Sequence, residues 1–217
     1  MRLQMRVCVA VSILGLVMQV PPALGQQQGA APSDAQQQAV TKLAEAVRKQ
    51  IVTNTQYGVF DSIHFAIKGG NTIILKGWAS RPTLKSSLEN SIKRIAGVTS
   101  VVNEIEVLPL SPNDDRIRAA VYAAIYGYGP LQRYTSNRGF GGRTGNSIAR
   151  QAGGITNDPP FGWHAIHIIV KNGNVTLTGV VDSEGDLTIA GMRANMVSGV
   201  FSVDNDLQVA GKPAKQG

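Results

Sequence analysis

Cysteine is almost absent from this chain of 217 residues: the only one, Cys8, lies inside an apolar run near the N-terminus. Aromatic residues make up 6% of the sequence, so a buried core must be mainly aliphatic. The apolar run, residues 7–20, is shorter than the ~20 residues that a membrane-spanning helix needs. These shortages exclude a fold stapled by disulfides, and the length leaves room for one or two domains.

The first 25 residues have the pattern of a secretory signal peptide. Arg2 and Arg6 precede the apolar run, two prolines follow it, and residues 23–25 supply an A-x-G cleavage site. Cleavage before Gln26 would remove the only cysteine and leave 19 basic and 14 acidic residues. An uncleaved membrane anchor is the alternative. The mild positive charge of the remainder suits anionic surfaces such as phospholipid headgroups.

One stretch of the sequence occurs twice. GVTSVVNEIEV begins at Gly97, and GVFSVDNDLQV begins at Gly199, with Gly, Val, Ser, Val, Asn and Val shared at matching positions. The repeat extends upstream, because residues 63–77 and 166–179 both alternate apolar and polar side chains around a turn rich in glycine and asparagine. Each of these segments is typical of a β-hairpin.

Two helices and a last strand complete each copy. Apolar residues recur at helical spacing after Ser80 and Ser183, which we expect to begin the crossover helices, and Gly97 and Gly199 are expected to stop them. Another helix pattern precedes each hairpin. We therefore predict an α+β fold of two tandem αββαβ modules, each a three-stranded mixed sheet with two helices packed on one face. The predicted segments are a signal peptide at 1–25, a flexible linker at 26–38, modules at 39–109 and 110–210, and a disordered tail at 211–217.

The glycine and aliphatic positions of the repeat form a recognisable pattern, G-x-V-x-L-x-G, a helix, and then G-V-x-x-V-x-N-x-L-x-V. In the second copy its residues are Gly173, Val175, Leu177, Gly179, Gly199, Val200, Val203, Asn205, Leu207 and Val209. The first copy matches at Gly77, Gly97, Val98, Val101, Asn103, Ile105 and Val107, but its turn has one additional residue. The pattern resembles the BON domain of bacterial envelope and osmotic-stress proteins. The resemblance implies a periplasmic or outer-membrane protein, associated with phospholipid contact and envelope integrity rather than catalysis.

Residues that carry chemistry are few. His64 and His167 occupy equivalent repeat positions, and neither cysteine nor a nearby carboxylate completes a metal site with them or with His164. The sequence has no G-x-S-x-G nucleophile motif. We expect Asn103 and Asn205 to satisfy backbone groups in the last strands. The sequence thus predicts a protein that is not an enzyme and has no catalytic residues, metal or cofactor.

A long insertion at residues 127–163 breaks the symmetry of the repeat. It is rich in glycine, arginine and aromatic residues, and we predict that Arg133, Arg138 and Arg143 contact anionic headgroups. An insertion without a function is the alternative interpretation. The same composition suits nucleic acid, but export directs the chain away from it, so no nucleic-acid partner is expected.

The second crossover helix is expected to have two apolar sides. Ile189, Met192 and Met196 cluster away from its core stripe, with Arg193 between the two. The second apolar side of such a helix must be covered by another surface, which could be the other module, a dimer partner or a lipid surface. Our hypothesis is that these four residues and the insertion bind phospholipid or a membrane surface. The alternative is an adaptor that binds an envelope protein or peptidoglycan, and the sequence leaves the oligomeric state open.

Overall fold

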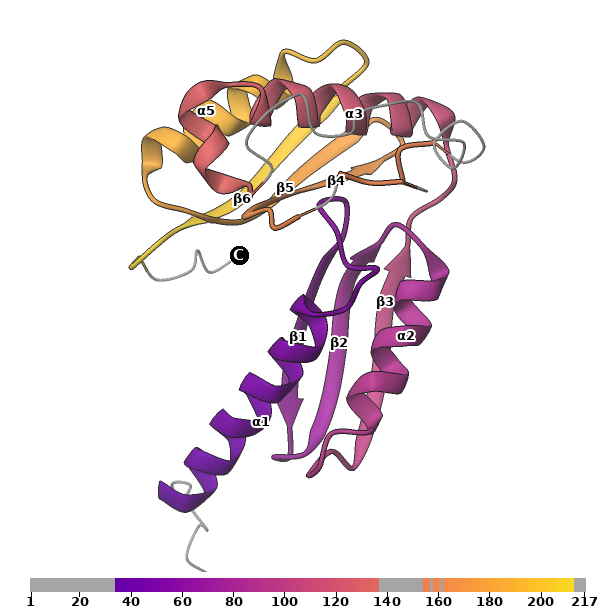
Figure 1. The fold of residues 1–217 in the computed structure, drawn as a ribbon, viewed down its shortest axis with the longest axis vertical. Helices are drawn as coiled ribbons and strands as arrows, with labels where there is room; N and C mark the ends of the chain where they lie inside the picture. Colours follow the sequence, from indigo (N-terminus) through magenta and orange to yellow (C-terminus); the bar gives the residue numbers. More distant parts are fainter. Residues whose placement is uncertain (1–33, 137–153, 157, 161, 213–217) are drawn as a thin grey trace, which may run out of the picture. The chain divides into compact units, whose positions relative to one another are not determined.

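The computed structural model describes residues 34–136, 154–156, 158–160 and 162–212 (Figure 1). The first module contains α1 (Asp34–Val52), β1 (Ser62–Lys68), β2 (Thr72–Ala79), α2 (Pro82–Lys93) and β3 (Ser100–Val107). The second contains α3 (Pro112–Tyr126), the 3-10 helix η1 (Gly129–Tyr134), β4 (Ile166–Lys171), β5 (Asn174–Val181), α5 (Glu184–Asn195) and β6 (Ser202–Val209). Helix α1 begins ahead of the module boundary expected at residue 39.

Each module has its own three-stranded sheet with the same topology. The orders are β1-β2-β3 and β4-β5-β6, and the central strand pairs antiparallel with the first strand and parallel with the last. A parallel pair requires a crossover, which α2 and α5 provide. The predicted fold, two αββαβ modules of the α+β class, is confirmed.

Both crossover helices end earlier, and one begins later, than the sequence suggested. Helix α2 is preceded by Arg81, which makes no side-chain cap, whereas Ser80 is buried and its backbone N–H donates to Asp61 Oδ1 at 2.6 Å. Ser183 does cap α5, accepting from the Asp186 N–H. The helices end at Lys93 and Asn195, and Gly97 and Gly199 lie in the following turns with φ of 93° and 91°.

Glycine is required where the hairpin strands approach most closely. Gly179 has φ of 122°, and a Cβ atom there would collide with the carbonyl oxygen of Ala165. Gly77 has φ of 111°, and a Cβ atom there would collide with the carbonyl oxygen of Ser62. Both modules therefore have a close backbone approach at the equivalent glycine.

An asparagine clasp joins the last strand to the crossover helix in each module. Asn205 Nδ2 donates to the Leu187 carbonyl at 2.8 Å, and Asn103 Nδ2 donates to the Lys85 carbonyl at 3.1 Å. Each side-chain oxygen also accepts from the backbone N–H two residues further along the strand. The expectation that these asparagines satisfy backbone groups is confirmed.

The first apolar core is aliphatic, whereas the second also contains Phe60, Tyr122, Tyr126 and Tyr134, and the two cores divide between the modules at an unexpected place. The first core is formed by Leu43, Val47, Ile51, Ile73, Leu75, Ala79, Leu84, Leu88, Ile92 and Ile105. Val59 and Phe60, which connect α1 to β1 in the first module, instead belong to the core of the second. Both are fully buried there, and the Phe60 ring contacts the Tyr122 ring edge-on at 6.4 Å.

This placement predicts that Phe60→Ala destabilises the protein by about 3–5 kcal/mol, because it leaves a cavity in the second core. Urea unfolding followed by circular dichroism measures the change. Phe201→Ala is the matched control, since Phe201 is exposed and its truncation is expected to change stability by less than about 0.5 kcal/mol. Equal effects of the two substitutions would contradict the assignment of Phe60 to this core.

Candidate functional site

Two large apolar side chains project into solvent beside one turn of the second module. Met196 and Phe201, 78% and 80% exposed, lie on either side of the turn that joins α5 to β6. We call this pair the apolar tip. Met192, 54% exposed, extends it along α5, because residues four apart lie on one side of a helix.

The tip is supported by the neighbouring β4–β5 hairpin. Parallel pairing of Asn174 with Ser202 places the hairpin turn next to Phe201, whose N–H donates to the Gly173 carbonyl at 2.9 Å. A Cβ atom on Gly173 would lie 2.5 Å from the Phe201 ring, so the ring rests directly on this glycine. The Asp114 carboxylate accepts from the N–H groups of Asn172 and Gly173, which fixes the turn on α3.

The first module repeats this backbone without the apolar side chains. Thr99, which corresponds to Phe201, donates its N–H to the Asn71 carbonyl at 3.0 Å. Arg94 corresponds to Met196, and both Arg94 and Thr99 are exposed. Since the same turn forms with polar residues, the fold does not require the apolar tip.

A cationic side chain lies next to the tip. Arg116 of α3 is exposed and donates to Asn113 Oδ1 at 3.0 Å and to the Ser198 carbonyl at 3.5 Å. Its guanidinium lies over the turn, 2.7 Å from where a Cβ on Gly199 would be. The arrangement of exposed apolar groups beside a cation matches the chemistry of an anionic lipid surface.

Sequence reasoning identified only part of this surface. It does not include Phe201, because helical spacing identifies residues on α5 and Phe201 lies beyond the end of this helix, nor Arg116, which belongs to α3. The signal was present in the repeat itself, where a threonine in the first copy becomes a phenylalanine in the second.

Two predicted residues of α5 face the rest of the module. Ile189 is half-buried and packs against the second core. The Arg193 guanidinium lies 4.3 Å from the centre of the Tyr128 ring, a cation–π contact. Of the four residues predicted on this helix, Met192 and Met196 are the ones exposed to solvent.

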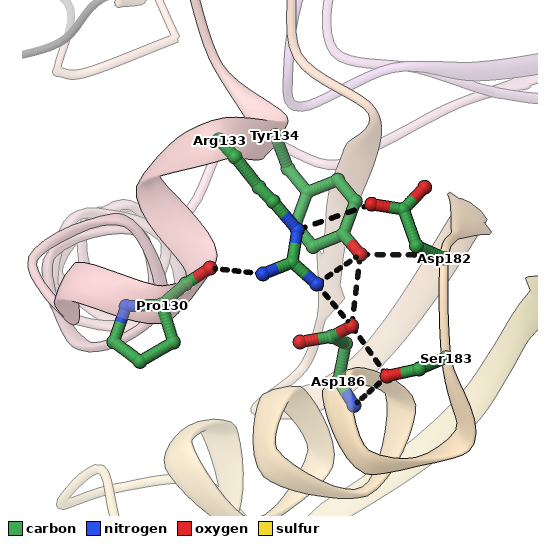
Figure 2. Close-up of polar contacts among 6 residues, drawn as sticks. All are labelled: Pro130, Arg133, Tyr134, Asp182, Ser183 and Asp186. Atoms are coloured by element: carbon green, nitrogen blue, oxygen red, sulfur yellow. Dashed lines mark hydrogen bonds and ion pairs between the residues drawn. The ribbon is translucent and has the colours of Figure 1, made fainter.

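Arg133 lies at the opposite end of α5 (Figure 2). Its guanidinium forms ion pairs with Asp182 at 3.1 Å and with Asp186 at 2.5 Å, and it hydrogen-bonds the Tyr134 hydroxyl at 3.1 Å. Asp186 is in the first turn of the helix and Met196 follows its last, about 15 Å away at the helical rise per residue. Arg133 therefore anchors the start of the insertion and does not join the apolar tip. The other two predicted arginines, Arg138 and Arg143, lie outside the described residues.

Asp186 is held in its charged form within this cluster. Burial alone would raise its pKa, but hydrogen bonds from Ser183 and Tyr134, with the Arg133 charge, lower the pKa below the usual value. The cluster ties η1 to the N-terminus of α5, where a carboxylate is also favoured by the helix dipole. These contacts stabilise the fold of the second module.

His164 is buried in the second module, where its ring contacts the rings of Tyr122 and Tyr126 of the second core. Its Nε2 is 3.2 Å from the Tyr122 hydroxyl, and its Nδ1 donates to the Gly162 carbonyl at 3.0 Å. Burial lowers the pKa of His164 to about 4. Among residues 34–136 and the described parts of 154–212, no group of three or more histidine, cysteine or acidic residues is placed to bind a metal ion.

Comparison with known proteins identifies the family. The sequence model of the BON domain matches residues 39–109 and again 154–211. The chain belongs to the BON domain family. Membership in this family indicates a role in phospholipid or envelope binding and points to a non-catalytic protein. In the part of this BON-domain chain that the structure describes, no helix has the length and apolar character needed to cross a membrane.

Other comparisons add little to the family assignment. No curated protein matches the chain. Two solved structures of CdsD, described as a structural protein of the type III secretion system of Chlamydia trachomatis, show weak similarity to this BON-domain chain. One has 14% identity, covering 77% of this chain and 96% of that chain, with a TM-score of 0.25. The other has 11% identity, covering 78% and 94%, with a TM-score of 0.27. At these TM-scores the likeness supports no functional argument.

The pKa of His164 predicts a loss of stability in acid. Its folded pKa of about 4 lies below the unfolded value of about 6.5, so its contribution is complete above pH 6.5 and is lost as the pH falls to 4. The difference corresponds to at most about 3 kcal/mol. Chemical unfolding at several pH values should give a shallower acid decline for His164→Gln than for the wild type. Parallel declines would contradict this account.

Proposed function

We propose that this chain is an exported, non-catalytic protein of the cell envelope that binds anionic phospholipid surfaces through the apolar tip of its second module. The observation that carries the proposal is the internal comparison of the two modules. The same turn has Arg94 and Thr99 in the first module but Met196 and Phe201, which are largely exposed, in the second. Apolar side chains that the fold does not need are expected to have a binding role.

The energetics of this surface suit reversible membrane contact. Complete burial of a methionine or phenylalanine side chain contributes about 1.5–3 kcal/mol, and a basic residue near an anionic membrane contributes about 1 kcal/mol. Met196, Phe201 and Arg116 together thus provide several kcal/mol. This is comparable to the binding of one acyl chain, which is reversible, and is far from the insertion of a membrane-spanning helix.

The proposed orientation follows from the ends of α5. The apolar tip and Arg116 lie at its C-terminal end, while Arg133 is ion-paired at its N-terminal end. The tip therefore makes the primary contact, with Met192 along the helix as the next residue to meet the surface. Arg138 and Arg143 remain proposed contributors to headgroup binding.

We predict that the wild-type protein floats with vesicles of phosphatidylcholine and phosphatidylglycerol, and that Met196→Asp with Phe201→Asp weakens the apparent affinity by about tenfold or more. The reason is the loss of at least the burial free energy of one apolar side chain, with about 1.4 kcal/mol per factor of ten. Salt should weaken wild-type binding without abolishing it, because only part of the contact is electrostatic.

The control is Arg94→Asp with Thr99→Asp, which places two carboxylates on the same turn of the first module and, because the Arg94 charge is also lost, changes the net charge by −3 against −2 for the tip variant. Its loss of affinity should be small by comparison. Equal flotation of wild type and the tip variant would contradict the proposal. Stoichiometric capture of an envelope protein through the tip, without vesicle binding, would instead support the adaptor function.

A further inference from the structure

The two modules are joined by more than the chain connection between β3 and α3. Residues 57–62, here called the strap, lie between α1 and β1 of the first module, end at the first residue of β1, and contact β4 and β5 of the second module. Val59 and Phe60 are buried in the second core, and the Val59 carbonyl accepts from the Ile168 N–H at 2.8 Å. The Thr178 hydroxyl donates to the Ser62 hydroxyl at 2.9 Å. The strap is thus a segment of the first module that docks on the second module.

His167 of β4 lies directly beneath the strap. Its Nδ1 is 3.2 Å from the Gly58 carbonyl, and since a carbonyl only accepts, Nδ1–H donates this hydrogen bond. The Tyr57 ring covers the imidazole at 5.2 Å between ring centres, tilted by 39°. Burial lowers the pKa of His167, although its hydrogen bonds to the strap backbone act in the opposite direction. The neutral imidazole therefore fits the docked strap better than the cation does.

Two other titratable groups of the strap, Tyr57 and Asp61, lie near His167. Burial, with the Asp61 charge, raises the pKa of Tyr57 to about 12, so its ring stays neutral. The Asp61 carboxylate accepts from the N–H groups of Gly58 and Ser80. Its own pKa is raised by burial, so proton uptake there favours the docked state and opposes the effect of His167.

Two further ionisable side chains lie on the same strand and just ahead of it. His164 is close enough for its pKa to be lowered by the charge of His167, after the larger effect of burial. Lys171 forms an ion pair with Glu106 of the first module at 2.5 Å. This pair is exposed on both sides and does not face the imidazole as a counter-ion.

The repeat offers an internal comparison for this histidine. His64 occupies the equivalent position on β1, and its side chain is exposed. No described residue of the chain packs on His64 in the way that Tyr57 packs on His167. The position of His167 therefore differs from that of His64 in being covered by the strap.

We propose that the strap is an acid-sensitive latch between the two modules, released from β4 when His167 takes up a proton. Release exposes His167 to water and removes the hydrogen bond to Gly58 and the cover of Tyr57. It also withdraws Val59 and Phe60 from the second core and opens an apolar site there. The latch is closed at neutral pH, and the fraction of open molecules rises as the medium becomes acidic.

The sign of the effect follows from linkage. The pKa of His167 is lower in the docked state than in the released state, where it is about 6.5. Docking is therefore strongest above pH 6.5 and weakens as the pH falls below it, by up to about tenfold per pH unit for one histidine.

Hydrogen exchange of the full-length protein between pH 7.5 and 5.5, corrected for intrinsic rates, tests the latch. The opening equilibrium constant for the amides of the strap and of Ile168 should be about tenfold larger at pH 5.5 than at pH 7.5. His167→Gln should abolish this response, because glutamine can still donate to Gly58 but takes up no proton. His64→Gln and Asp61→Asn should both retain it.

A crosslinked variant separates latch release from general acid unfolding. With Cys8→Ser, the pair Ser62→Cys and Thr178→Cys places two thiols where the two hydroxyl groups are in contact. The oxidised form should show no acid opening of the strap, and reduction should restore it. The proposal is overturned by constant strap protection in the wild type, by an unchanged acid response in His167→Gln, or by loss of the response in Asp61→Asn. A His167 pKa at or above about 6.5, titrated by NMR, would overturn it as well.

Discussion

The return of the crossover helix into a parallel strand is the constraint on which the rest of this structure depends. Because β3 and β6 pair in parallel with their central strands, the chain must run the length of the sheet as a helix and then reverse within a few residues. Gly97 and Gly199 adopt the left-handed conformation in these turns, and the asparagine clasps hold each returning strand to its helix. The flanking side chains are thereby left outside the core in both modules.

Because of this constraint, the residues that stabilise the fold differ from those that we propose to bind a surface. The buried aliphatic residues and the clasps define the fold equally in the two modules, whereas the residues beside the turn are free to vary. The first module has Arg94 and Thr99 there, and the second has Met196 and Phe201. Duplication thus provides one scaffold twice, and only the second copy has an apolar surface at this position. The strap makes the two copies depend on each other, because Val59 and Phe60 of the first module complete the core of the second.

Most of the fold follows from sequence because its signals are local and occur twice. Alternation identifies the hairpins, helical spacing identifies α2 and α5, and the repeated glycines mark the turns. The strap could not be predicted, since Val59 and Phe60 lie in a short connection without periodicity and their partners are more than 50 residues away. The ion pairs of Arg133 with Asp182 and Asp186 escape prediction because these residues are also distant in sequence, by 49 and 53 positions. Phe201 was predictable in principle, by comparing the two copies position by position.

The most direct measurement of the central claim is the environment of the two turns on a membrane. In a Cys8→Ser background, an environment-sensitive fluorophore attached through Met196→Cys or, separately, Arg94→Cys reports whether each turn enters the lipid. On addition of anionic vesicles, the account predicts a shift to shorter emission wavelength for the label at position 196 and little change at position 94. Equal shifts at both positions, or no shift at 196 while the protein remains bound to the vesicles, would contradict it.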